Sequence, residues 1–149
     1  MFRGTFAHSI DDKGRIAIPR RFREQLAQLG DSAVVLTRAL DSRFRCLDLY
    51  PLSEWARLEA RLGEMPPFES RTVDFKRLYV HPAQDQQIDA QGRVLVPVEL
   101  RDYAGLGKEA VFTGDLQKFQ LWSQPDWENG RRELDEARQD PSFFGDFSF

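Results

Sequence analysis

An Asp and an Arg four residues apart, with a Gly just before the Arg, occur twice in the chain. The first copy lies in residues 10–19 and the second in residues 88–97. The shared polar and turn residues are Asp11, Gly14 and Arg15 in the first copy and Asp89, Gly92 and Arg93 in the second. A carboxylate beside a guanidinium holds it in one orientation through a charge-assisted hydrogen bond. An Arg fixed in this way at a loop tip suits contact with phosphate or guanine.

Each copy predicts a tight turn that leads into a strand. Asp favours turn backbone, and Gly supplies a positive φ without steric cost. The aliphatic triplets at residues 16–18 and 94–96 then suit buried strands. The offset between the copies is constant at 78 residues, so the sequence contains one unit used twice.

A single copy favours a simpler interpretation, in which the Asp and Arg only stabilise their turn. Two copies, with basic residues beside the first, favour binding of an anion. Residues 1–23 contain six Lys or Arg residues against two Asp, a net charge of +4, whereas the whole chain carries −3. A locally basic region on an acidic protein is an electrostatic footprint for phosphate, although a weaker one than a high pI would give.

The hydrophobic pattern predicts strands around the turns and helices between them. In the first half we expect strands near 5–10, 15–18, 33–37 and 46–50, with a turn at Asp41 and Ser42. Helices are predicted from Pro19 to Gly30 and, with Ser53 as N-cap, on to Gly63. The second half repeats this order after a connector with a short helix near 73–79, and a charged helix is expected at 128–140. Because short strands cannot bury both faces alone, we expect the halves to pair with each other.

The composition argues against several other classes of protein. Cys46 is the only cysteine, and His8 and His81 are far apart, so neither an intramolecular disulfide nor a metal site is expected. No apolar run is long enough to span a membrane, and no signal peptide is apparent, so a cytoplasmic location is expected. We expect no cofactor and no small-molecule ligand.

Residues 1–4 (Met-Phe-Arg-Gly), residues 11–15 with Ile18 and Pro19, and the second Asp89 and Arg93 set resemble the MraZ family of bacterial transcriptional regulators. The resemblance spans roughly residues 1–135. It implies a β-rich α+β fold of two tandem AbrB-like double-psi or swapped-hairpin units, related by pseudo-two-fold symmetry, with packed helices. With it we expect a first unit at 1–63, a connector at 64–82, a second unit at 83–135 and a C-terminal tail at 136–149.

The resemblance also implies a homo-oligomer, in the form of a closed ring, that binds double-stranded DNA. The expected targets are repeats of a short G-containing box upstream of the cell-division and cell-wall gene cluster that includes its own gene. We therefore expect a sequence-specific, nucleoid-associated transcriptional regulator that acts as a repressor. Linked subunits on adjacent boxes raise avidity, which a single chain with two arginines would lack.

The expected DNA contacts come from five basic residues: Arg15, Arg93, Lys13, Arg3 and Arg20. Four residues are expected to shape the turns and orient the arginines: Asp11, Asp89, Gly14 and Gly92. Gln91 takes the place of the Lys13 charge in the second copy. The two halves are therefore not expected to contribute equally to DNA binding.

Two other functions remain open from the residues alone. An enzyme is disfavoured, because the sequence has no nucleophile elbow, metal triad or phosphate loop. The second alternative is an antitoxin-like AbrB relative or an oligomeric protein-interaction scaffold; the scaffold would use the four Phe residues of segment 141–149 for docking.

Overall fold

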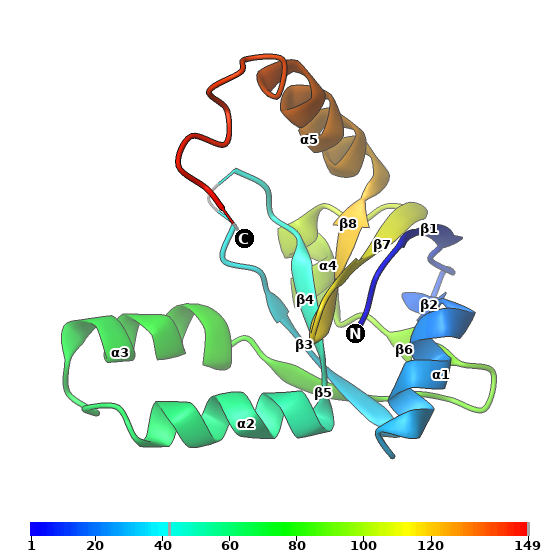
Figure 1. Cartoon of the computed structure of the whole chain (residues 1–149). Helices are drawn as coiled ribbons and strands as arrows, with labels where there is room; N and C mark the ends of the chain where they lie inside the picture. The colour runs from blue at the N-terminus through cyan, green and yellow to red at the C-terminus, as the bar shows by residue number, and fades with distance from the viewer. Residues whose placement is uncertain (42, 149) are drawn as a thin grey trace.

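The structure, a computed structural model, describes residues 1–41 and 43–148 (Figure 1). The strands are β1 (Thr5–Ser9), β2 (Arg15–Ala17), β3 (Ala33–Arg38), β4 (Leu47–Pro51), β5 (Gln84–Gln87), β6 (Arg93–Leu95), β7 (Glu109–Asp115) and β8 (Lys118–Ser123). The helices are α1 (Arg20–Gln28), α2 (Leu52–Gly63), α3 (Ser70–Phe75), α4 (Val98–Ala104) and α5 (Gln124–Ala137), with a π-helical turn η1 (Lys76–Val80) directly after α3.

Six of these strands form one antiparallel sheet in the order β1-β7-β8-β4-β3-β5, and β2 pairs with β6 in a separate small sheet. Both sheets contain strands from the two halves of the chain. β1 of the first half pairs with β7, and β5 of the second half pairs with β3. The expected pairing between halves is thus confirmed, and the fold is α+β with a largely antiparallel sheet.

The main core lies on the face of the large sheet that α1, α4 and the small sheet cover. Strand alternation decides which side chains enter it. Leu36 of β3 is fully buried there with Phe22 of α1, whereas the preceding Val35 points to the opposite face and packs with Trp55 and Tyr79. That opposite face is covered by α2 and η1 at one end and by the start of α5 at the other.

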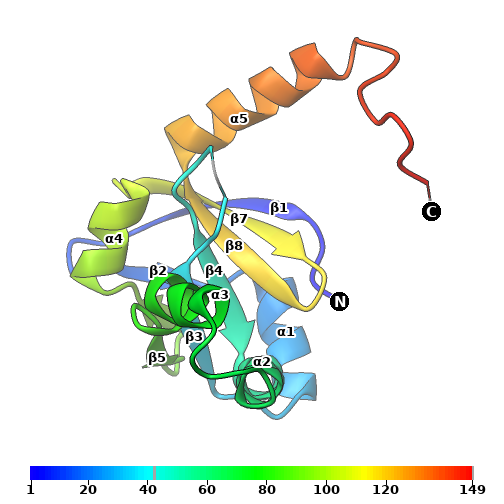
Figure 2. The same cartoon turned by 90° about the vertical axis from the view of Figure 1, so that its left-hand side faces the viewer.

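Helices α2 and α3 project together to one side of the sheet, and α5 extends beyond it (Figures 1 and 2). Helix α5 carries the C-terminal segment away from the sheet (Figure 2). The β2–β6 pair instead lies beside α1, next to the large sheet (Figure 1). The two turns that the sequence singles out therefore lie next to the main core, in which Ile16 of β2 and Val94 of β6 are buried.

The largest differences between predicted and observed element ends are in three helices. The helix expected after an N-cap at Ser53 begins at Leu52, and the Ser53 hydroxyl donates to Asp31 at 2.9 Å instead of capping the helix. The last helix begins at Gln124, after an N-cap at Ser123, and ends at Ala137 rather than 140. The connector helix starts at Ser70. Of the predicted turn and tail, Ser42 and Phe149 lie outside the described residues.

Candidate functional site

The first turn is built around the Asp11 carboxylate. One of its oxygens accepts hydrogen bonds from the backbone N–H groups of Lys13 (3.0 Å) and Arg15 (2.9 Å). The other accepts from Arg15 Nε at 2.8 Å. Gly14 closes the turn with a φ of +84°, which few other residues adopt. The Asp therefore shapes the backbone and also holds the Arg side chain.

The second turn has the same geometry. Asp89 accepts from the backbone N–H groups of Gln91 and Arg93, both at 2.9 Å, and from Arg93 Nε at 2.9 Å. Gly92 has a φ of +76°. The repeat in sequence is thus a repeat in hydrogen bonding, because every one of these contacts joins residues no more than four positions apart.

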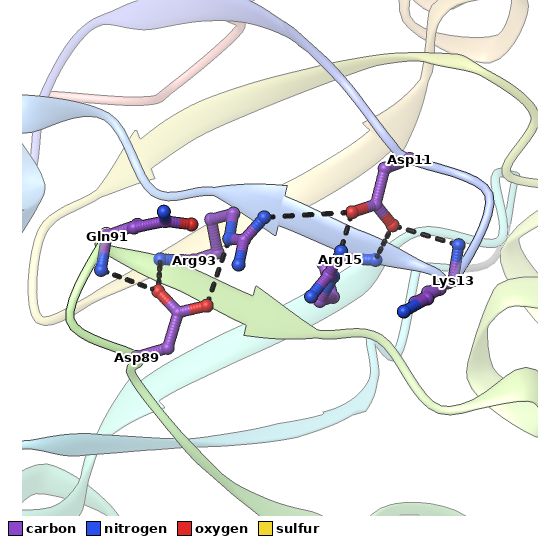
Figure 3. Close-up of polar contacts among 6 residues, drawn as sticks. All are labelled: Asp11, Lys13, Arg15, Asp89, Gln91 and Arg93. Atoms are coloured by element: carbon purple, nitrogen blue, oxygen red, sulfur yellow. Dashed lines mark hydrogen bonds and ion pairs between the residues drawn. The ribbon is translucent and has the colours of Figure 1, made fainter.

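The two turns lie side by side because β2 and β6 pair in antiparallel register, with Ile16 opposite Val94 (Figure 3). Each strand continues into a backbone bond with the glycine of the other turn. The Ile18 N–H donates to the Gly92 carbonyl at 2.9 Å, and the Val96 N–H donates to the Gly14 carbonyl at 2.8 Å. The two turns consequently form one rigid unit rather than two independent loops.

An ion pair between the turns completes this unit. Arg93 Nη1 lies 4.0 Å from the Asp11 carboxylate, which Arg15 also contacts (Figure 3). The side chains of Arg15 and Arg93 are 34% and 29% exposed. Both guanidiniums therefore have a fixed orientation and still reach solvent, as contact with an anion or a base edge requires.

The hydrogen bonds also set the charge of the two carboxylates. Backbone N–H donation from Arg15 is the largest cause that lowers the pKa of Asp11, and backbone donation from Arg93 does the same for the pKa of Asp89. Both groups remain ionised at neutral pH. The carboxylates can therefore orient the two arginines under physiological conditions.

The remaining basic candidates lie in three different places. Lys13 is exposed at the tip of the first turn, with its side chain directed away from Asp11 (Figure 3), and Gln91 is exposed at the same position of the second turn. Arg20 begins α1, is 84% exposed and pairs with Glu24 at 3.1 Å. Arg3 lies at the far end of β1, roughly 25 Å of extended chain from the first turn. The structure thus brings Lys13 beside the arginines but does not bring Arg3 there.

Two arginines that the sequence interpretation did not select lie against the turns. Arg101 of α4 packs on Gly14, and Arg23 of α1 packs on Gly92, so each half covers the turn of the other half. These two arginines are 78 positions apart, which is the offset of the repeat. Extending the comparison of the two copies into the following helices would have found them.

Three other features concern metal binding, thiol chemistry and membrane insertion. Within residues 1–41 and 43–148, no three His, Cys, Asp or Glu side chains are grouped so that they could hold a metal ion. Burial raises the pKa of the Cys46 thiol to about 12, which leaves it protonated at neutral pH. No helix in the same residues is long and apolar enough to cross a membrane.

A family model described as MraZ protein matches residues 1–78 and 80–142. The chain belongs to the MraZ family. The resemblance seen in residues 1–19 and 88–97 is thereby confirmed. The matched residues include both turns, so the duplicated unit belongs to the part of the chain that resembles this family.

Curated MraZ relatives resemble the chain over nearly its whole length. The protein named transcriptional regulator MraZ from Alkalilimnicola ehrlichii is 45% identical over 141 residues, which cover 94% of this chain and 93% of that protein. The protein of the same name from Pseudomonas aeruginosa is 42% identical and covers 92% of this chain and 89% of its own. That from Shewanella woodyi is 41% identical, with 96% and 93% covered.

Proposed function

We propose that this chain is a transcriptional regulator that binds DNA through the paired turns. The observation that carries the proposal is the duplicated Asp and Arg geometry, in which Asp11 holds Arg15 and Asp89 holds Arg93. A guanidinium fixed in one orientation matches the two acceptors on the major-groove edge of guanine, or two phosphate oxygens. The names of the relatives support regulation of transcription as the outcome of that binding.

Within this proposal each residue has a specific role. Arg15 and Arg93 contact base edges or phosphates, Lys13 contacts phosphate, and Asp11 and Asp89 orient the arginines. Arg20 is a further phosphate contact, reached by breaking its exposed ion pair, and Arg3 would contact DNA only at a distance from the turns. Gly14 and Gly92 keep the backbone in the conformation that aims the arginines.

Oligomerisation is part of the proposed mechanism. Two oriented arginines make few DNA contacts, and affinity rises with the number of phosphates that are neutralised. Several linked protomers, arranged in a ring, would engage repeated G-containing boxes together and raise avidity about 10²-fold or more. We propose that these boxes lie upstream of the cell-division and cell-wall genes, including its own gene, where the protein acts as a repressor in the nucleoid.

The strand exchange suggests a finer description of the fold. We propose that residues 1–63 and 83–135 are two AbrB-like swapped-hairpin units, that residues 64–82 connect them and that the tail begins near 136. The pairing of β1 with β7 and of β5 with β3 supports exchange between such units. Such an exchange also accounts for the pairing of β2 with β6, which places the two turns side by side.

A salt series of DNA binding tests the proposed function. Labelled DNA from upstream of the gene and a scrambled control are titrated with wild-type protein and with the double variant Arg15→Ala, Arg93→Ala. We expect specific binding to weaken by about 1 to 3 kcal/mol for each Arg that reads a base. The matched control is Arg57→Ala, Arg131→Ala, which removes two exposed arginines from α2 and α5.

The outcome separates the proposed function from the scaffold alternative. Specific, salt-sensitive binding that the turn variant loses and the control variant keeps would support a DNA-binding regulator. An intact wild-type oligomer that retains neither DNA would contradict it. In that case the turns would serve only to stabilise the β2–β6 unit.

A further inference from the structure

Arg101 is held against the first turn from the opposite half of the chain. Its Nε donates to the Val96 carbonyl at 2.8 Å, and the Val96 N–H in turn donates to the Gly14 carbonyl. The contact with Gly14 is close, because a Cβ on that residue would lie only 2.6 Å from Arg101 Cζ. The guanidinium therefore has a fixed place beside the turn, although it comes from a different helix.

A groove of about 580 Å³ opens next to this guanidinium, between the first turn and the start of β7. Its charged side chains are Arg101, Lys108, Asp11 and Asp12. The Asp11 carboxylate is already bonded to Arg15 at 2.8 Å. Two cations therefore face one carboxylate, that of Asp12, that is not already paired with an arginine.

The cationic groups of this groove have free donors. Within the described residues, the hydrogen bond to Val96 is the only one that the Arg101 side chain makes, and it uses Nε. The terminal Nη atoms of Arg101 and the exposed ammonium of Lys108 have no protein partner in the same residues. Such donors are suited to phosphate oxygens, which accept from an Arg fork and from a Lys point charge.

The equivalent groove beside the second turn differs in charge. Arg23 lies there on Gly92, but the groove is smaller, about 280 Å³, and its other charged side chains are Asp31 and Asp89. The Arg23 Nε is buried without a hydrogen-bond partner among the described residues. Asp89 is already paired with Arg93, as Asp11 is with Arg15, so one cation faces one other carboxylate, that of Asp31, and this groove attracts phosphate less than the first does. The repeat therefore places equivalent arginines in different electrostatic surroundings.

We propose that the groove between the first turn and β7 binds a phosphate of the DNA backbone through Arg101 and Lys108. The inference rests on the proposed function and adds to it a second contact surface, supplied to the first turn by the second half of the chain. Arg15 then contacts a base or phosphate at the turn, while Arg101 and Lys108 fix the position of the backbone beside it. Arg23 has no DNA contact and only supports the second turn.

The dependence of DNA affinity on salt tests this assignment. Wild type, Arg101→Gln, Lys108→Gln and Arg23→Gln are titrated with the upstream DNA and with scrambled DNA over a range of salt concentration. The slope of log K against log salt falls by about 0.9 for each phosphate that the protein no longer neutralises. We expect Arg101→Gln and Lys108→Gln to lower the slope by about that amount per bound protomer, equally on both DNAs, and Arg23→Gln to leave it unchanged.

Two variants, Lys108→Gln and Arg101→Lys, separate DNA binding from a structural role. Lys108 is exposed and its side chain makes no hydrogen bond or ion pair within the described residues, so Lys108→Gln reports on the groove even if Arg101→Gln fails to fold. Arg101→Lys keeps the charge but removes the planar fork, and we expect it to keep the wild-type slope. Thermal unfolding of each variant shows whether it is folded.

The results distinguish the inference from the function on which it rests. Wild-type slopes in both Arg101→Gln and Lys108→Gln, with specific binding still present, would overturn the inference and leave the proposed function standing. An equal fall of slope in Arg23→Gln would overturn the assignment to the first groove. Wild-type protein that retains no DNA at any salt concentration would overturn both.

Discussion

Asp11 and Arg93 belong to different copies of the repeat, yet Arg93 Nη1 lies 4.0 Å from the Asp11 carboxylate. The same carboxylate holds Arg15 of its own turn at 2.8 Å. Asp11 therefore contacts both of the arginines proposed to bind DNA, whereas within the described residues Asp89 forms an ion pair with just one of them, Arg93. The two turns look equivalent in sequence, but the first contains the residue that joins them.

The Asp11→Asn variant tests this role. The amide keeps the size of the side chain but removes the charge that holds the two guanidiniums, so we expect specific DNA binding to weaken about tenfold. Asp12→Asn is the matched control, because it removes the same charge from an exposed neighbour. If the two carboxylates did no more than repel the DNA backbone, both variants would bind DNA slightly more tightly than wild type. Tighter binding by Asp11→Asn would therefore contradict an orienting role.

The pH dependence of stability follows from the same carboxylates. The pKa values of Asp11 and Asp89 are lower in the folded chain than the ordinary 3.8, so their contribution to stability is fully present well above that value and is lost as the pH falls through the folded pKa. We expect a double Asp11→Asn, Asp89→Asn variant to lose less melting temperature than wild type between about pH 7 and about pH 2.5. An equal loss of melting temperature in the variant and in wild type over this pH range would contradict this linkage.

Substitution of Gly14 tests the geometry of the turn. In Gly14→Ala a residue with a Cβ must adopt a backbone φ of +84°, and this Cβ also pushes the Arg101 guanidinium away from Val96. The backbone strain alone costs about 1 to 2 kcal/mol, and urea unfolding measures the total. Gly63→Ala is the control, since nothing lies within 4 Å of the added Cβ and no positive φ is involved. It should be neutral or more stable by about 0.4 to 1 kcal/mol.

A buried charge on the other face of the sheet gives a stability prediction unrelated to DNA. Asp48 is 3% exposed and is bonded to Lys118 at 3.2 Å, to Gln120 and to the Tyr79 hydroxyl. Lys118→Met leaves its carboxylate without a counter-charge, and we expect a cost of about 3 kcal/mol. This lies at the low end of the range, because Gln120 and Tyr79 still donate hydrogen bonds.

The double variant Asp48→Asn, Lys118→Met is the control for that prediction. Removing both charges avoids an unpaired buried carboxylate, so the double variant should recover part of the stability that Lys118→Met loses. Denaturation in urea measures wild type, Asp48→Asn, Lys118→Met and the double variant. A double variant as unstable as the sum of the two single changes would contradict a direct interaction between Asp48 and Lys118.

The local chemistry of the turns follows from the sequence alone. Asp11, Gly14 and Arg15 interact within five consecutive residues, and so do their equivalents near Asp89. Contacts of this range depend on turn propensity and side-chain reach, which are readable from residue types. The order of strands and helices was predictable for the same reason. The errors lie at the ends of strands and helices, such as that at Ser53, whose hydroxyl bonds to a tertiary partner, Asp31, instead of capping the helix.

Long-range packing sets which distant residues share a surface. The packing of Arg101 on Gly14 and the contact between the two turns both follow from how β2 and β6 pair across the halves. Partners some 80 to 100 positions apart leave no signal in a local pattern of hydrophobicity or turn residues. The residues and the hydrogen bonds of each turn were therefore determined by the local sequence. The contact between the two turns, and the unequal charge of the two grooves beside them, result from strand pairing between the halves.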